Sequence, residues 1–401
     1  MSKYVLLANL SYLPDFGGVE NSLRHLCSEY RKLGFTPIIL TCQSSDLRYK
    51  PCEKIGDAVV IRSCRMKGVW GAVITLLGMA RFSISLAKKR SFCVVISRNQ
   101  ISSLFVRTFI EAFHVYLAPG FAQFQTSNEN MQTKELSTVQ KILKSIKRNV
   151  NGWLDKQALV KSHRVYLFSA NMLEQARIVL GKKSQIAEKF IITKPGVKST
   201  RFLPSQNIFE KLQLREKYNL PKHEFLFLCI GRLVAAKGFD LAIKAMKDQD
   251  TNCTLVVIGD GPERESLEAL AVEEGVGDKV IFKGSTNFPE EYYRLSDAFL
   301  MTSRYEPLGQ TILEAAATGL PIISFKNGAT INSNIFVTNA TYEIVGDLGD
   351  YVERYDEKVL ADKMNEIIAR KDLNLISDSL RELVQTQFSW NSLAQSLTRK
   401  D

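Results

Sequence analysis

The chain has 401 residues, a length that predicts two or three domains. Apolar residues make up 45% and charged residues 24%, which excludes a disordered, collagenous or coiled-coil protein. The net charge of +11 is unevenly distributed, because residues 1–200 carry 30 Lys and Arg against 12 Asp and Glu, whereas residues 201–401 carry 23 against 30. A first half at +18 and a second half at −7 predict two bodies that meet different partners.

The seven cysteines include no Cys-x-x-Cys pair, which excludes a disulfide framework and a zinc ribbon and favours a reducing compartment. The first apolar run is broken by Asn9 and Pro14, so it does not read as a signal peptide. The longest apolar stretch, residues 69–80, is too short to span a bilayer. We therefore expect a cytoplasmic protein.

Strand-like and helix-like periods alternate along the first half of the chain. The predicted strands are residues 4–10, 36–42, 59–63, 92–97, 114–118 and 164–168, and the predicted helices include residues 19–33, 134–160 and 171–180. Such alternation with short loops predicts a parallel sheet covered on both faces.

The pattern pauses between Pro195 and about Pro221, where we place the hinge. It then restarts with predicted strands at residues 224–230, 254–258, 280–282, 298–302 and 321–325, separated by predicted helices that include residues 263–274 and 309–318. The predicted fold is α/β, with two doubly wound Rossmann-like domains facing across a cleft. The domains are residues 1–195 and 205–384, and the C-terminal helix, residues 385–401, packs back on the first.

In each predicted domain, a glycine-containing turn follows the first strand. Gly17 and Gly18 let backbone N–H groups approach a phosphate at a helix N-terminus, although an ordinary turn explains such a pair equally well. Gly231 and Arg232 precede Lys237, and two cations five residues apart can bind one diphosphate. Taken alone, this second turn is also explained as a solvated basic loop.

The segment 303–321 is more specific. Glu306 follows an apolar strand, and Gly309 opens a helix, so the amides of Gly309, Gln310 and Thr311 can donate to a phosphate. Glu314 lies about one turn inside that helix. One carboxylate can accept hydrogen bonds from sugar hydroxyls and the other from ribose hydroxyls.

The spacing of Glu306 and Glu314 resembles the E-x7-E signature of the retaining GT-B-fold glycosyltransferases of family 4 (glycosyl transferases group 1). The resemblance covers nearly the whole chain. It extends to residues 17–20 as the N-terminal glycine loop, residues 231–238 as the diphosphate clamp, and residues 257–262, 282–284 and 388–390.

The resemblance implies transfer of a sugar from a nucleotide-diphosphate donor with retention of anomeric configuration, without a metal or another cofactor. Arg232 and Lys237 would neutralise the leaving diphosphate, which is electrostatic stabilisation of the charge that develops there. Glu306 would contact the donor sugar and Glu314 the ribose. By the same resemblance, the donor-binding residues are Gly17, Gly18, Gly231, Leu308, Gly309, Gln310, Thr311 and Glu314.

The chain departs from the family pattern at three places. Residues 116–120 contain no His where many members carry one, and the nearby His114 is more simply a packed core residue. Leu308 replaces the usual Phe, and residues 325–330 lack the usual glutamate. A catalytically silent nucleotide-sugar-binding subunit and a GT-B-fold nucleotide-sugar epimerase therefore remain alternatives.

The resemblance implies that the basic N-terminal domain holds the acceptor, a saccharide or a polyprenyl-diphosphate-linked saccharide in surface polysaccharide synthesis. The predicted helix 134–160 carries cations beside an apolar stripe, namely Lys141, Lys144, Lys147 and Arg148. An earlier apolar stretch ends in the three cations at residues 88–90. Basic amphipathic helices bind anionic membranes, so we expect peripheral attachment to the cytoplasmic face of the inner membrane. The alternative is that both helices only cover the sheet. No nucleic-acid-binding module is recognisable.

Overall fold

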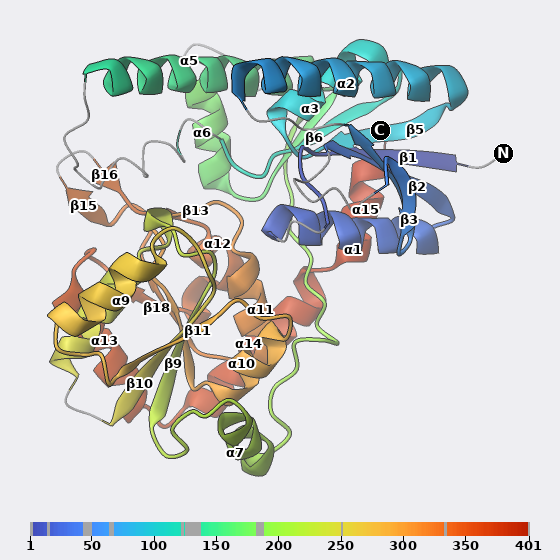
Figure 1. Cartoon of the computed structure of the whole chain (residues 1–401). Helices are drawn as coiled ribbons and strands as arrows, with labels where there is room; N and C mark the ends of the chain where they lie inside the picture. The colour runs from blue at the N-terminus through green and yellow to red at the C-terminus, as the bar shows by residue number, and fades with distance from the viewer. Residues whose placement is uncertain are drawn as a thin grey trace. The chain divides into compact units, whose positions relative to one another are not determined.

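A computed structural model describes residues 3–13, 17–42, 50–63, 68–121, 124, 138–181, 188–249, 252–332 and 335–399 (Figure 1). The side chains of residues 68–76, 138–144 and 331–336 are outside this description. The chain divides into two compact units. The N-terminal unit holds the residues up to 123, residues 136–196 and residues 390–401, and the C-terminal unit includes residues 197–389.

The N-terminal unit is built on an eight-stranded sheet in the order β3-β4-β2-β1-β5-β6-β7-β8, parallel except for β3. Its strands are β1 (Lys3–Ala8), β2 (Phe35–Cys42), β3 (Cys52–Ile55), β4 (Ala58–Ser63), β5 (Phe92–Ser97), β6 (His114–Leu117), β7 (Arg164–Leu167) and β8 (Phe190–Ile192). Its helices are α1 (Gly18–Lys32), α2 (Gly68–Lys89), α3 (Gln100–Phe109), α5 (Thr138–Lys161), α6 (Ala170–Leu180) and α15 (Trp390–Thr398).

The C-terminal unit has a six-stranded parallel sheet in the order β11-β10-β9-β12-β14-β18. The strands are β9 (Phe225–Ile230), β10 (Cys253–Ile258), β11 (Val280–Gly284), β12 (Ala298–Met301), β14 (Ile322–Phe325) and β18 (Asp350–Val352). The helices are α7 (Ile208–Lys217), α8 (Phe239–Ala245), α9 (Arg264–Glu273), α10 (Pro289–Leu295), α11 (Gln310–Thr318), α12 (Thr341–Val345), α13 (Glu357–Ala369) and α14 (Leu373–Gln387). Two short ladders, β13 (Tyr305–Glu306) with β17 (Thr338–Asn339) and β15 (Thr330–Asn332) with β16 (Ile335–Phe336), lie outside the main sheet.

Both faces of the C-terminal sheet are buried, which explains why its strands read as continuous apolar runs. In β9, Phe227 belongs to the core on one face and Leu228 to the core on the other. Leu255 and Val256 divide in the same way in β10. The predicted α/β fold class with two doubly wound units is therefore confirmed.

The strand order places one topological switch point in each sheet. In the C-terminal sheet the chain first adds strands on one side of β9 and then, from β12, on the other side. In the N-terminal sheet the same reversal separates β1 from β5. Ligands of open parallel sheets bind at the carboxyl ends of strands at such points. The loops after β9, β12, β1 and β5 are therefore the ones to examine.

The stretch 195–221, where we placed the hinge, contains the boundary between the two units, at residues 196 and 197, and also the helix α7. One predicted segment differs from the structure. The predicted single helix 385–401 is two helices, because Phe388 leaves the helical path after α14, with φ −120° and ψ 75°. The second helix, α15, packs on α1, where Trp390 stacks on His25 with 5.2 Å between ring centroids and Asn391 donates to Glu29 at 3.2 Å.

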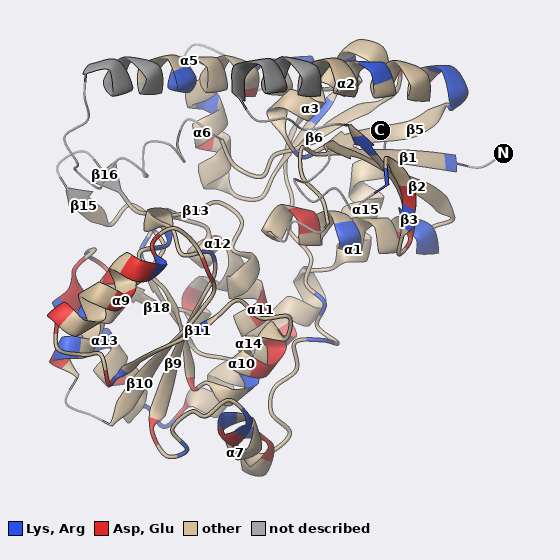
Figure 2. Cartoon of the chain, in the orientation of Figure 1, with Lys and Arg blue, Asp and Glu red and all other residues tan. Residues whose placement is uncertain are grey.

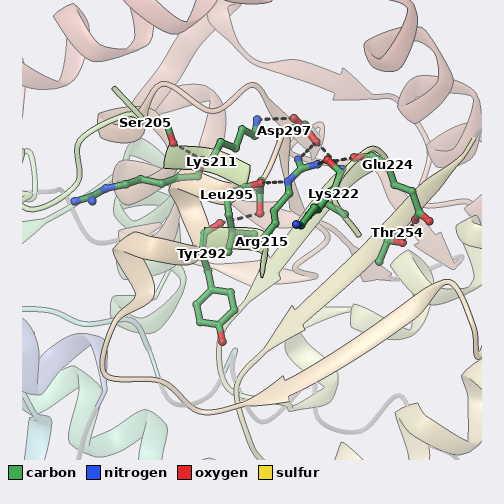
Figure 3. A network of polar contacts seen from close by, with 12 residues as sticks. Ser205, Lys211, Arg215, Lys222, Glu224, Thr254, Tyr292, Leu295 and Asp297 are labelled. Carbon is green, nitrogen blue, oxygen red and sulfur yellow. Dashed lines mark hydrogen bonds and ion pairs between the residues drawn. The ribbon is translucent and has the colours of Figure 1, made fainter. Parts of the chain in front are cut away.

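A buried network joins α7 to the amino ends of β9 and β12 (Figure 3). Asp297 accepts from Lys211 at 2.5 Å, from Arg215 at 2.6 Å and from the backbone N–H of Leu226 at 2.7 Å. Arg215 also donates to the carbonyl oxygens of Leu295, Lys222 and Glu224. Because these strand ends are opposite the carboxyl ends, the network stabilises the unit without contributing to a ligand site.

Candidate functional site

The turn that carries Lys237 follows β9 at the switch point. Its first residue, Gly231, donates its N–H to the carbonyl of Ile258 at 3.0 Å, which ties the turn to the end of β10. Residues Ala235–Lys237 form one turn of 3-10 helix, and Gly238 then adopts a left-handed conformation with φ 64°. A Cβ atom on Gly238 would lie 2.2 Å from the carbonyl oxygen of Thr302, so only glycine fits there.

The segment after β12 holds this turn in place. The Thr302 hydroxyl donates to the carbonyl of Lys237 at 3.0 Å. The guanidinium of Arg304 donates to the carbonyl of Ala235 and pairs with Asp240 at 2.6 Å. The backbone positions of Lys237 and Glu306 are thus fixed relative to each other within one unit.

Glu306 is positioned by the two-residue ladder of β13 with β17. Its carbonyl accepts from the N–H of Ala340 at 3.0 Å, and its side chain is 11% exposed. One carboxylate oxygen forms an ion pair with the ammonium of Lys237. The other accepts from the N–H of Gly309 at 3.1 Å. The structure therefore brings together three of the predicted site residues, Lys237, Glu306 and Gly309.

Helix α11 begins directly after Gly309, which is left-handed with φ 71°. A Cβ atom there would lie 2.7 Å from side-chain carbons of Ile312 and Ile344. Leu308 before it is buried, and the buried hydroxyl of Thr311 has no hydrogen-bond partner among the described residues. The first-turn amides at residues 309–311 lie at the positive end of the helix, where an anion is favoured.

Glu314 lies one turn further into α11 and forms a separate contact. Tyr293 from α10 donates its hydroxyl to the Glu314 carboxyl at 3.0 Å. Burial raises the pKa of Glu314 to about 7, against the opposing effects of the Tyr293 hydrogen bond and of Arg201. The carboxyl is thus only partly ionised at neutral pH.

Arg232 is exposed, and its side chain has no ion pair or hydrogen bond with any described residue. It follows Gly231 in the same loop as Lys237, five positions earlier.

The remaining predicted residues lie in the N-terminal unit, at its own switch point. Gly17 is the N-cap of α1 in extended conformation, and Gly18 is the first residue of that helix. Glu20 in the first turn is buried and accepts a hydrogen bond from the hydroxyl of Ser11. Arg98, at the carboxyl end of β5, is fully buried and donates to the carbonyl of Leu117 at 3.1 Å.

His114 begins β6, at the end of the strand opposite the switch-point edge. It is buried, with its ring 2.8 Å from the carbonyl oxygen of Ile110, and burial lowers its pKa to about 4. A neutral histidine packed in this way is structural.

Sequence reasoning missed two residues of this site, Arg304 and Tyr293. Both contact residues of other elements. Arg304 reaches Asp240, 64 positions earlier, and Tyr293 reaches Glu314, 21 positions later. Arg304 lies inside the signature segment, but its position in the sequence does not indicate that its side chain contacts the loop after β9. Among the described residues, no group of three or more His, Cys, Asp and Glu side chains is placed to hold a metal ion.

Comparison with known proteins gives related sequences and structures. Residues 210–375 match the family model of glycosyl transferases group 1. A GDP-mannose-dependent alpha-(1-6)-phosphatidylinositol monomannoside mannosyltransferase of Mycobacterium tuberculosis is 32% identical over 216 residues, 51% of this chain and 53% of that protein. The alpha-D-kanosaminyltransferase of Streptomyces kanamyceticus is 28% identical over 53% of this chain and 56% of its own. The chain thus spans about half the length of the curated relatives it matches.

Solved structures match over almost the whole chain. Sucrose-phosphate synthase from Thermosynechococcus elongatus superposes with a TM-score of 0.78 at 20% identity, covering 98% of this chain and 97% of that one. WaaG, a glycosyltransferase of lipopolysaccharide biosynthesis, gives 0.74 at 18% identity, covering 98% of both chains. The chain has the GT-B fold, and its residues 210–375 match the model of the glycosyl transferases group 1, in agreement with the sequence resemblance.

Proposed function

We propose that the chain is a retaining, metal-independent glycosyltransferase that moves a sugar from a nucleotide-diphosphate donor to a saccharide or lipid-linked saccharide. One observation carries the proposal. The Glu306 carboxylate contacts both the ammonium of Lys237 and the N–H of Gly309 at the start of α11, beside the switch point of the C-terminal sheet.

These groups supply the charges that the reaction needs. As the glycosidic bond breaks, negative charge develops on the diphosphate, and Lys237, Arg232 and the first-turn amides of α11 stabilise it. Glu306 accepts hydrogen bonds from the donor sugar, and Glu314 accepts them from the ribose. The acceptor hydroxyl attacks the face from which the diphosphate departs, and its proton passes to the leaving phosphate oxygen.

The compared proteins support a nucleotide-sugar donor. Anabaena HepE, which superposes with a TM-score of 0.73, was solved in complex with UDP, and a second structure of it with UDP-glucose. The mycobacterial relative is named as GDP-mannose-dependent and the LpsD relative of Rhizobium meliloti as a lipopolysaccharide core glycosyltransferase. A lipid-linked or surface-polysaccharide acceptor at a cytoplasmic membrane face is consistent with these names.

The test has two stages. UDP-, GDP- and ADP-sugars are first screened for thermal stabilisation, since a ligand at 100 times its Kd adds about 2.7 kcal/mol. The stabilising donor is then assayed for release of free nucleotide diphosphate with saccharide acceptors, in the presence and absence of EDTA. Release that persists in EDTA and is lost in Glu306→Gln but not in Glu265→Gln, an exposed acid on α9, supports the proposal. Loss in EDTA that added Mg²⁺ restores contradicts metal independence.

A second candidate follows from residues 116–120, which contain no His, and from the structural role of His114. The chain would then be a catalytically silent nucleotide-sugar-binding subunit. That reading requires donor stabilisation in the first stage with no nucleotide diphosphate released in the second.

A further inference from the structure

Helices α2 and α5 expose apolar side chains on their outer faces. Ile146, Val150, Trp153 and Val160 on α5 are each 50–54% exposed, and their spacing of four, three and seven residues keeps them on one side. The opposite side of the same helix is buried, through Asp155, Ala158 and Leu159. The apolar stripe therefore does not cover the sheet and faces away from it.

The described part of α2 likewise has one exposed side and one buried side. Leu77, Arg81, Ile84 and Lys88 recur at helical spacing and are all exposed, whereas Met79, Ser83 and Leu86 are buried. Both helices pack on α3, so they belong to one layer on one face of the N-terminal sheet (Figure 1).

The exposed charged side chains described on α2 and α5 are all positive. They are Arg81, Lys88 and Lys89 on α2 and Lys147, Arg148, Lys156 and Lys161 on α5, and both helices carry blue segments in Figure 2. Of these, Arg148 lies seven residues before Asp155 and therefore on the side away from the apolar stripe. None of these seven side chains forms an ion pair within the described residues. The only acid in residues 77–89 and 145–161 is the buried Asp155. Lys141 and Lys144, which continue the sequence pattern, lie outside the described side chains.

We propose that the outer face of α2 and α5 binds an anionic lipid bilayer, with the apolar stripe entering the headgroup region and the cations contacting lipid phosphates. Unpaired cations beside exposed Trp, Ile, Val and Leu form the combination that interfacial helices use. A second copy of the chain fits this face poorly, because its six like charges would meet six. The inference goes beyond glycosyl transfer and stands whether or not the C-terminal site is active.

The test uses the full chain and flotation with vesicles of phosphatidylcholine, with or without one-third phosphatidylglycerol. We expect binding to the anionic vesicles only, weakened by salt. Each cation near an anionic surface contributes a factor of about 5, so Lys156→Gln with Lys161→Gln should lower the partition coefficient roughly 30-fold. Lys358→Gln on α13 is the matched charge control and should leave it unchanged.

The apolar stripe is tested separately with Ile146→Ser and Val150→Ser together, with Val272→Ser on α9 as the exposed apolar control. In a Trp70→Phe chain, where α2 carries no tryptophan, brominated lipid should quench Trp153 fluorescence, and the further change Trp153→Phe should abolish that quenching. Equal binding to neutral and anionic vesicles, full binding by the stripe variant, or quenching that survives Trp153→Phe would each overturn the proposal. The proposal would also be overturned if the chain sedimented as a dimer that does not bind vesicles and the stripe variant sedimented as a monomer.

Discussion

Replacing Glu314 by Gln should stabilise the protein at alkaline pH. Folding raises the pKa of this carboxyl from 4.5 to about 7, chiefly through burial, so the folded chain binds its proton more tightly than the unfolded chain does. Ionisation of Glu314 therefore costs stability progressively as pH rises from about 4.5 to 7, and the full cost, about 3 kcal/mol, applies above pH 7. Glutamine cannot ionise, and its amide oxygen can still accept the hydrogen bond from Tyr293.

Thermal unfolding followed by circular dichroism between pH 4.5 and 8.5 measures this difference. Since about 1 kcal/mol shifts Tm by about 2–4 °C in a unit of this size, Glu314→Gln should unfold roughly 6–12 °C higher than the unmodified chain at pH 8. The two should converge near pH 4.5. Glu265→Gln on the exposed face of α9 should show no such pH-dependent gain. A Glu314→Gln curve that tracks the unmodified chain at every pH would refute the reasoning from burial.

Three further outcomes follow from the site and the fold. Lys237→Met and Arg232→Ala should each lower turnover by a factor of about 10²–10³, measured as release of nucleotide diphosphate. Lys358→Met is the control. Unchanged rates in both variants would contradict an electrostatic role for these two cations. The donor KM should fall roughly tenfold between pH 6 and pH 8. Glu314 ionises over this range because its pKa is about 7, and the ionised carboxylate accepts hydrogen bonds from ribose hydroxyls better than the neutral acid does. In Glu314→Gln the donor KM should not depend on pH over this range. Asp297→Ala should lower the free energy of unfolding, measured in urea, by about 3–5 kcal/mol, because Arg215 is left buried without its carboxylate. The exposed control Asp278→Ala should change the free energy of unfolding little. Equal urea midpoints for the two variants would contradict the stabilising role of the network.

The sequence predicted the parallel sheets, and it placed Glu306, Gly309 and Glu314 in one segment, because both are local patterns; the binding roles of these residues stay predictions. Apolar runs alternate with helical periods, and Glu306, Gly309 and Glu314 lie within nine positions of one another. Arg304 and Tyr293 were not predictable in this way, because their partners belong to other elements. The ladder of β13 with β17 was missed because each strand has two residues, too few for any period.

Helix α5 shows a different limit. Its periodicity predicted an apolar stripe next to cations, but periodicity alone does not tell which side of a helix packs on the sheet. The buried side proved to carry Asp155, Ala158 and Leu159, and the stripe with Trp153 faces outward. The break before α15 was missed for a related reason, because the apolar residues Phe388 and Trp390 continue the pattern across it.

The resting contact between Lys237 and Glu306 has a consequence for selectivity among anions. Each side chain neutralises the other, so the pair by itself offers little net attraction to inorganic phosphate, and a bound phosphate would place negative charge beside a nearly buried carboxylate. A ligand that carries hydroxyl groups as well as phosphates can donate hydrogen bonds to Glu306 while its phosphates accept them from Lys237. We therefore expect the pair to favour such ligands over bare anions.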